Sequence, residues 1–373
     1  MAETTRQRQS IEETFREARD RQAAGRLEEA KRLYGDILAR VPHHAESLTM
    51  LGSVAYQQGD DTQAEAYLDR AIEIYEAVLK QMPGLVTVRA PLVNVMLARG
   101  RRAEAEAYAA DLELRINPVR ATAKEFTRRR RLAQERGLPA MLINTVPKSA
   151  SESIWNRLAE GLLMGQGHLS LGLFPACCVL PVRVAAAAEG GMIAKEHLLA
   201  TDFNLKVLAE RGLRKVVCHL RDPRQATLSW AHFVRDDVSM RLMGPIWRQI
   251  VPPASVPKDD LGRQIDWCID HYLPLLIDFV RGWAAAHDDP QGAIEVLFLS
   301  FEEFRTEPDG YIAKVLEFHG IEGRRFAPDA ESEVVHLRKG LVDEWREVFT
   351  AAQKERAWSR IPKDYAEMFG WQP

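Results

Sequence analysis

Cysteine is scarce in this chain of 373 residues, which holds four: Cys177, Cys178, Cys218 and Cys268. Their spacing fits neither a metal-ligand pattern nor a disulfide framework. Long apolar runs are missing as well, and the polar N-terminus has the features of neither a signal peptide nor a membrane anchor. We therefore expect buried thiols, no membrane span and a bacterial, cytoplasmic protein.

Neither sign of charge dominates, because 50 Lys and Arg face 53 Asp and Glu, for a net charge of −3. This balance argues against general nucleic-acid binding. The glycines of a nucleoside-triphosphate loop are also missing before Lys148 and Ser149, which argues against a kinase. A hydrophobic fraction of 46% over this length predicts a soluble protein of two or three domains.

Several motifs in the C-terminal two thirds place charged side chains directly after apolar runs. Residues 215–220 are typical of a buried strand; Asp222 then suits a helix N-cap, and Pro223 suits the first helical position. Arg221 should therefore lie at the carboxyl end of a strand, with Ser229 two turns into the following helix. Open α/β sheets bind ligands at that edge.

The other motifs follow the same plan. Residues 142–146 predict a strand, and residues 147–155 a tight turn into a helix, whose N-terminus favours anions. Lys148 adds a mobile ammonium there. Residues 191–198 predict a strand that delivers His197 at its carboxyl end. Residues 338–340 are Arg-Lys-Gly. The arginine offers a planar guanidinium for bidentate phosphate contact, the lysine a point charge, and the glycine lets the backbone approach a ligand closely.

In their order and spacing these motifs resemble the sulfotransferases that use 3′-phosphoadenosine 5′-phosphosulfate (PAPS), over residues 141–373. The resemblance implies that Arg221 and Ser229 bind the 3′-phosphate. It implies that the triplet Arg338, Lys339 and Gly340 closes over that phosphate. It also implies a 5′-phosphosulfate loop, formed by Lys148, Ser149, Ala150, Ser151, Glu152 and Ser153.

The loop departs from the usual Pro-Lys-Ser-Gly-Thr-Thr, because Ala150 replaces the glycine and Glu152 the second threonine. A carboxylate aimed at a phosphate would repel it. Residues 149–152 also fit a capping box, in which Glu152 reaches back to the Ser149 amide and faces away from the ligand; we favour this interpretation. The family's aromatic residue falls at Ser153, and Trp155 comes two positions late, so the partner of the adenine ring stays open.

The resemblance implies a chemistry as well. His197 would act as the general base that deprotonates an acceptor hydroxyl, with Glu196 as the alternative. Lys148 would stabilise charge on the departing oxygen, PAP would be the product, and no metal would be needed. The acceptor would be a glycan, a lipid or another small molecule, and residues 233–261 lie where the family builds a variable acceptor cover.

The N-terminal third has an internal repeat, in which three glycines each precede an alanine by five residues. The pairs are Gly25 and Ala30, Gly59 and Ala64, and Gly100 and Ala105. The first interval of 34 residues is the tetratricopeptide (TPR) period, and the second, of 41, predicts one helix longer by two turns over residues 64–81. Pro42 and Pro118 close the first and third units, and the pattern resembles TPR repeats. An irregular helical bundle is the alternative.

The sequence thus predicts a TPR-like helical module over residues 1–118 and a linking helix over residues 119–139. In that helix the four arginines at 128–131 form a solvated face. A P-loop-like α/β sulfotransferase domain with a central parallel sheet follows over residues 140–373. We expect the repeats to bind a protein partner or a second copy of the chain. The competing hypothesis is a TPR adaptor whose nucleotide-binding domain is catalytically degenerate.

Overall fold

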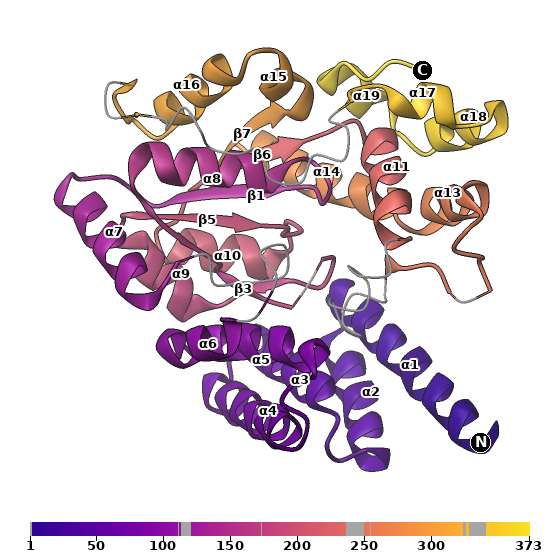
Figure 1. Ribbon diagram of the computed structural model, residues 1–373. Helices are drawn as coiled ribbons and strands as arrows, with labels where there is room; N and C mark the ends of the chain where they lie inside the picture. Colours follow the sequence, from indigo (N-terminus) through magenta and orange to yellow (C-terminus); the bar gives the residue numbers. More distant parts are fainter. Residues whose placement is uncertain are drawn as a thin grey trace. The chain divides into compact units, whose positions relative to one another are not determined.

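The computed structural model describes residues 2–110, 112, 121–172, 174–235, 250–253, 255–323, 326–327 and 341–373, with side chains from residue 10 onward. The chain divides into two compact units (Figure 1). The helical unit comprises Met1–Ala123, Ser170–Leu180 and Val238–Val251. The α/β unit comprises Lys124–Leu169, Pro181–Asp237 and Pro252–Pro373. The domain limits at residues 118 and 139 stay predictions.

The helical unit has the predicted repeat. Its helices are α1 (Ala2–Ala23), α2 (Leu27–Arg40), α3 (Ala45–Gln57), α4 (Asp61–Gln81), α5 (Val86–Ala98) and α6 (Arg102–Ala109), and each packs against the next. The three repeat glycines lie in turns between paired helices, with φ of +72°, +80° and +74°. The three repeat alanines are fully buried. Helix α4 has 21 residues against 14 in α2, which confirms the predicted insertion of two turns.

A short hairpin from the later sequence completes the core of the helical unit. Strand β3 (Ser170–Leu171) pairs antiparallel with β4 (Cys178–Val179). Leu171 and Leu180 are buried in one hydrophobic cluster with residues of α3 to α6. The Sγ atom of Cys178 lies 2.9 Å from the Oγ atom of Ser53. All four cysteines are buried free thiols, which confirms the prediction for Cys177 and Cys178.

The α/β unit is built on a five-stranded sheet. Its order is β2 (Gly165–Gly167), β5 (Met192–Glu196), β1 (Met141–Thr145), β6 (Lys215–Leu220) and β7 (Glu295–Ser300), and every pair is parallel. Strand β1 is central, so Asn144 pairs with Glu196 on one side and Cys218 on the other. The carboxyl ends of β1, β5 and β6 therefore meet at one edge. The predicted parallel sheet is confirmed.

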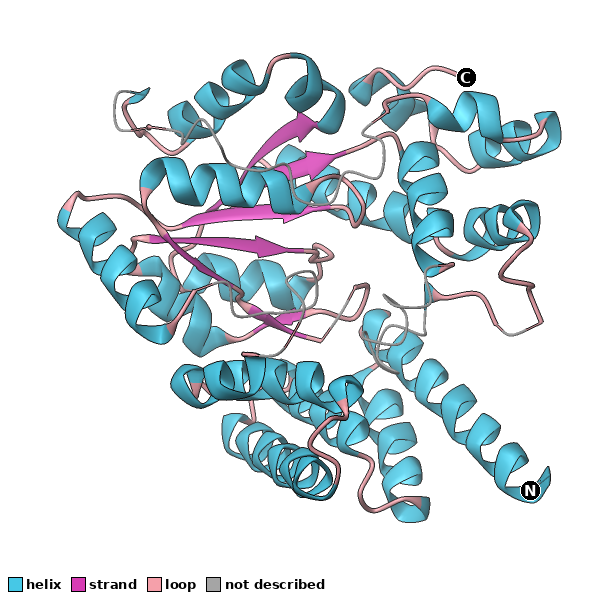
Figure 2. Ribbon diagram, viewed as in Figure 1, coloured by secondary structure: helices cyan, strands magenta, loops and turns pink. Residues whose placement is uncertain are grey.

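Helices cover both faces of this sheet (Figure 2). Helices α8 (Ser151–Leu162) and α16 (Pro308–Phe318) share a hydrophobic cluster with Ile143, Ile193 and Val217 of the strands. Figure 1 shows α8 in front of the sheet, with α10 (Asp202–Glu210) and α14 (Leu273–Asp288) behind it. Further helices in the described part of this unit are α9 (Pro181–Ala188), α11 (Pro223–Val234), α13 (Leu261–His271), α15 (Phe301–Thr306), α17 (Glu344–Val348), α18 (Ala351–Ser359) and α19 (Lys363–Phe369).

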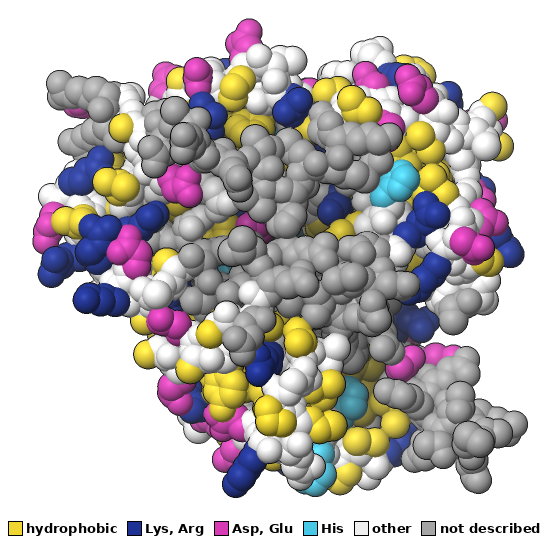
Figure 3. Space-filling view, viewed as in Figure 1, with side chains coloured by type: hydrophobic (Ala, Val, Ile, Leu, Met, Phe, Trp, Pro, Cys, Tyr) yellow, Lys and Arg dark blue, Asp and Glu magenta, His cyan; other side chains and the backbone are white. Residues whose placement is uncertain are grey.

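Helix α7 (Ala123–Glu135) carries the arginine run, and Figure 3 shows Lys and Arg side chains gathered over it. Arg128 and Arg131 are exposed by 52% and 69%, as a solvated face requires. Arg130 differs, because its guanidinium donates to the Ala186 carbonyl and pairs with Glu189 at 2.9 Å. The run thus also docks α7 against α9. Among the described residues, no helix is both long and apolar enough to cross a bilayer.

Candidate functional site

The loop after β1 has a backbone shape that normally calls for glycine. Lys148 and Ala150 have φ of +70° and +64°, in the left-handed region that side chains with a Cβ adopt at a cost. Ala150 stands where the usual loop has glycine, and it keeps the left-handed conformation nonetheless. The Ser149 hydroxyl donates to the Val146 carbonyl at 2.7 Å, which closes the turn. The departure at Ala150 therefore leaves a tight turn into α8.

The predicted capping box is wrong. Helix α8 begins at Ser151, its N-cap residue is Ala150, and no side chain caps it. The Ser149 hydroxyl is turned to Val146 instead, and the carboxylate of Glu152 accepts a hydrogen bond from the ammonium of Lys195 on β5. Glu152 therefore pairs with the positive charge of Lys195 rather than with the nearby Ser149 amide. Glu152 thus lies at the helix N-terminus as half of an ion pair.

His197 follows β5 and is half-buried, with its ring held by the neighbouring strand. Its Nδ1 atom lies 2.7 Å from the Thr145 carbonyl oxygen and 3.0 Å from the Thr145 hydroxyl. A carbonyl oxygen can only accept, so Nδ1 carries the hydrogen and Nε2 keeps its lone pair. Burial, and then the charge of Lys195, lower the pKa of His197 to about 4. At neutral pH this ring is uncharged and can accept a proton at Nε2.

Glu196, the alternative base, is buried and bound to the segment that follows β2. Its side chain is 4% exposed, and the carboxylate accepts from the Leu169 amide and lies 3.7 Å from Nδ1 of His168. Successive residues of a strand point to opposite faces, so Lys195 and Glu196 diverge. The geometry supports His197 over Glu196 as the proton acceptor.

Arg221 follows β6 as predicted and links two loops. Its guanidinium, 7% exposed, donates to the carbonyls of Lys148 at 2.8 Å and Leu341 at 2.9 Å. Leu341 is the first described residue after the Arg-Lys-Gly motif. Arg338, Lys339 and Gly340 themselves lie outside the described residues. Arg221 therefore brings the ends of two predicted phosphate-binding segments together at the sheet edge.

The start of α11 agrees with its prediction. The Asp222 side chain accepts from the Arg224 amide at 2.8 Å, and Pro223 is the first helical residue. Ser229, half-buried, follows two turns later. At the end of this helix the ammonium of Lys148 lies 4.1 Å from the centre of the Phe233 ring. Most of the predicted acceptor cover, residues 236–249 and 254, lies outside the described residues.

Trp155 does not lie where it could stack on a nucleotide base. It is 1% exposed, and its indole N–H donates to the Ile193 carbonyl at 3.0 Å. Ser153, one of the predicted loop residues, is half-buried in the first turn of α8, and Ser151 is buried. The described residues include no group of three or more His, Cys, Asp or Glu side chains that could hold a metal ion.

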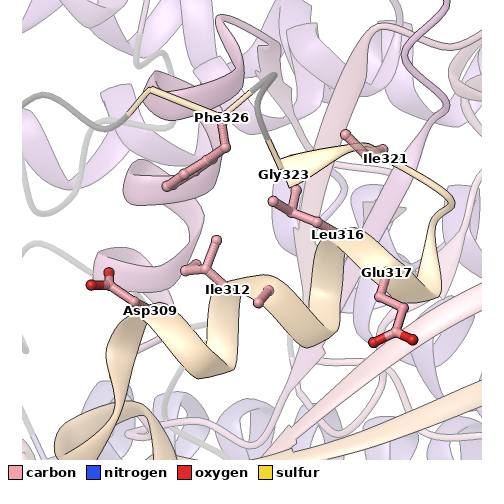
Figure 4. Close-up of a pocket in the computed structure, with 8 residues that line it drawn as sticks. Asp309, Ile312, Leu316, Glu317, Ile321, Gly323 and Phe326 are labelled. Carbon is pink, nitrogen blue, oxygen red and sulfur yellow. The ribbon is translucent and has the colours of Figure 1, made fainter.

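A cavity of about 540 Å³ lies along α16, away from these residues (Figure 4). Its lining is mostly apolar and comes from residues 309–326, with Phe326 at one side. No predicted site residue lines it. Sequence reasoning did not single out three residues near the site. Thr145 bonds His197, Lys195 pairs with Glu152, and Asn144 bonds Leu198, the residue after His197. The position of Lys195 two residues before His197 was a usable signal, because side chains two apart share a strand face.

Comparison with known proteins agrees with this organisation. Residues 15–78 match the family model for a tetratricopeptide repeat, and residues 180–334 match the model for a sulfotransferase domain. Both predicted resemblances are thereby confirmed. One matching solved structure, mouse sulfotransferase SULT7A1 complexed with PAP, is 15% identical and covers 66% of this chain and 92% of its own, with a TM-score of 0.41. No curated protein matches the chain.

Proposed function

We propose that this protein transfers a sulfuryl group from PAPS to an acceptor hydroxyl and releases PAP. The observation that carries the proposal is the meeting of three features at one sheet edge. These are the neutral His197, the turn of residues 147–150 into the N-terminus of α8, and the guanidinium of Arg221. The sulfotransferase domain match supports the reaction class.

In the proposed reaction the acceptor oxygen attacks the sulfur, and the bond from sulfur to the bridging phosphate oxygen breaks. The hydroxyl proton goes to Nε2 of His197, which is the unprotonated ring nitrogen. Negative charge grows on the bridging oxygen of PAP. Lys148 and the positive end of the α8 dipole would stabilise that charge.

The negative charge of PAPS is complementary to the charges near the loop of residues 147–150. Lys148, Lys195 and Arg221 bring three cations, and Glu152 offsets one of them. The guanidinium of Arg221 donates to the Lys148 and Leu341 carbonyls, and we assign it a charge-assisted contact to the 3′-phosphate. Arg338, Lys339 and Ser229 complete the proposed 3′-phosphate contacts. The acceptor is proposed only as a hydroxyl compound.

Titration of the purified protein with PAP, AMP and ATP tests the nucleotide site. PAP is expected to bind far more tightly than AMP, because only PAP carries the 3′-phosphate. Arg221→Ala should weaken PAP binding by about 1.5–3 kcal/mol, or roughly 10- to 150-fold. AMP binding should weaken less, because AMP has no 3′-phosphate and loses only the support that Arg221 gives to the Lys148 carbonyl. Arg211→Ala, an exposed arginine at the end of α10, is the matched control.

Equal affinity for PAP and AMP would refute the 3′-phosphate assignment. Tightest binding of ATP would favour a kinase. No binding of any nucleotide would favour the adaptor hypothesis, in which only the repeats act. These outcomes follow from one calorimetric experiment.

The ion pair at the start of α8 gives a second prediction. Glu152→Thr removes a carboxylate beside the proposed phosphate site and leaves the Lys195 charge uncompensated. PAP should then bind about fivefold more tightly at low salt, since one unit charge a few ångströms away contributes on the order of 1 kcal/mol. The gain should shrink as salt screens it. Glu160→Thr, in the last turn of the same helix, is the control, and weaker binding by Glu152→Thr would contradict the prediction.

A further inference from the structure

The side chain of Asn144 is fully buried near the end of β1 and binds the residue that follows His197. Its Nδ2 group donates to the Leu198 carbonyl at 3.1 Å, and its Oδ1 atom accepts from the Leu198 amide at 2.7 Å. The amide thus makes both of the hydrogen bonds that a neighbouring strand would make. It extends the pairing of β1 and β5 past Glu196, where the backbone ladder ends.

The next residue of β1 binds the histidine ring itself. The Thr145 carbonyl accepts from Nδ1 of His197 at 2.7 Å, and the Thr145 hydroxyl lies 3.0 Å from the same atom. Asn144 therefore holds the main chain at Leu198, and Thr145 holds the ring of His197. The indole N–H of Trp283 on α14 adds a third bond, to the Leu198 carbonyl at 2.7 Å.

Burial alone does not require an amide at position 144. Leu142 and Ile143, the preceding residues of β1, are apolar and fully buried. A buried amide is costly unless both of its polar ends are bonded. Both ends of Asn144 bond to one residue, the neighbour of His197, and the Cys218 thiol adds a further hydrogen bond to this side chain. A bidentate bond of this kind fixes both the position and the direction of the main chain there.

We propose that Asn144 is a positioning residue that holds His197 in one orientation and one tautomer, with Nδ1 on Thr145 and Nε2 open to the acceptor. The role of the base rests on the proposed function; the orientation of the ring does not. Without Asn144 the Leu198 amide loses its hydrogen-bond acceptor, and the main chain at His197 and Leu198 can rotate. The ring then leaves the Thr145 carbonyl, and the two tautomers become similar in energy.

The charged groups around the ring fix the direction of the expected pH change. Burial is the largest influence and disfavours the protonated ring, as does Lys195 of β5, while the bond to the Thr145 carbonyl, Glu196 and Glu152 of α8 favour it. A ring that swings toward water loses the Thr145 bond, which lowers its pKa, but regains solvation, which raises it. Because burial is the largest influence, the pKa should rise toward about 6.5. A base with a higher pKa is protonated, and inactive, at a higher pH.

The test combines nitrogen NMR of the imidazole rings with kinetics on the full chain, comparing Asn144→Ala with wild type. Wild type should show His197 as the Nδ1–H tautomer, titrating well below pH 6. Asn144→Ala should show mixed tautomers, a higher titration midpoint and a kcat lower on the order of 10²-fold. Its affinity for PAP should stay the same. The matched control is Asn204→Ala, an equally buried amide that donates to the Leu199 carbonyl and should leave the ring signals unchanged.

An Asn144→Ala protein that keeps the wild-type tautomer and titration overturns the proposal, and so does a control that alters them equally. If Asn144→Ala does not fold, Asn144→Ser applies the same criteria with a smaller polar group. Wild type without turnover would refute the proposed function, while the NMR comparison would still decide the role of Asn144. The two failures are therefore distinguishable.

Discussion

Replacing His197 with alanine is expected to lower kcat by about 10²–10⁴-fold, the usual contribution of a general base. PAP affinity should change little, because the ring accepts a proton from the acceptor and no nucleotide contact is assigned to it. The unprotonated Nε2 atom, set by the Thr145 carbonyl, is the structural reason. The measurement is kcat with a phenolic or alcoholic test acceptor, together with a PAP titration.

Two substitutions nearby serve as controls. His168→Ala removes a second half-buried histidine, whose Nδ1 atom lies 2.8 Å from the Lys195 carbonyl, and should cost far less activity. Glu196→Gln tests the alternative base. A fully active His197→Ala combined with an inactive Glu196→Gln would contradict the assignment and favour the carboxylate.

The pH profile of wild type adds a separate check. Burial and Lys195 hold the pKa of His197 at about 4, so the ring stays neutral at every pH well above that value. Activity should therefore be flat from about pH 5.5 upward and should fall only as the pH approaches 4. An ordinary histidine would already lose activity near pH 6.5. An acidic limb near that value would show that the ring is more exposed during turnover.

The features that sequence predicted well depend on residues close together in the chain. Asp222 and Pro223 start α11 where expected, because a cap acts on amides two or three residues away. The glycine at position 59 takes its positive φ in a local turn, and the 41-residue interval translates directly into the longer α4. Local sequence suffices for such features.

The features that sequence missed depend on contacts between distant segments. The capping box at Ser149 was plausible locally, yet Glu152 pairs with Lys195, 43 positions away. Asn144 acts on Leu198, 54 positions away, and nothing near Asn144 in the chain reveals that partner. The hairpin of residues 170–180 reads as part of the α/β sequence, and only its buried contacts assign it to the helical unit.

Deleting residues 1–118 is expected to leave an aggregating fragment. The hairpin would remain while the helices that bury it are removed. Leu171, Ala176, Cys178 and Leu180 are all at most 4% exposed in the intact chain. Exposing the two leucines alone would forfeit roughly 3–6 kcal/mol, from about 1.5–3 kcal/mol for each large side chain. A contiguous apolar surface of this kind drives association. Light scattering and gel filtration measure the outcome.

A second deletion separates the role of the hairpin from that of the repeats. Removing residues 1–118 and also replacing Ser170–Leu180 with a short glycine-serine linker takes away both halves of the shared core. This fragment should be more soluble than the first, because no apolar hairpin remains exposed. His168 and Leu169, which end the α/β segment before the hairpin, contact Lys195 and Glu196. The linker must therefore begin after Leu169 to preserve the end of β5. If the first fragment is monomeric and fully active on small acceptors, the hairpin does not need the helices, and recruitment of a large acceptor becomes the better account of the repeats.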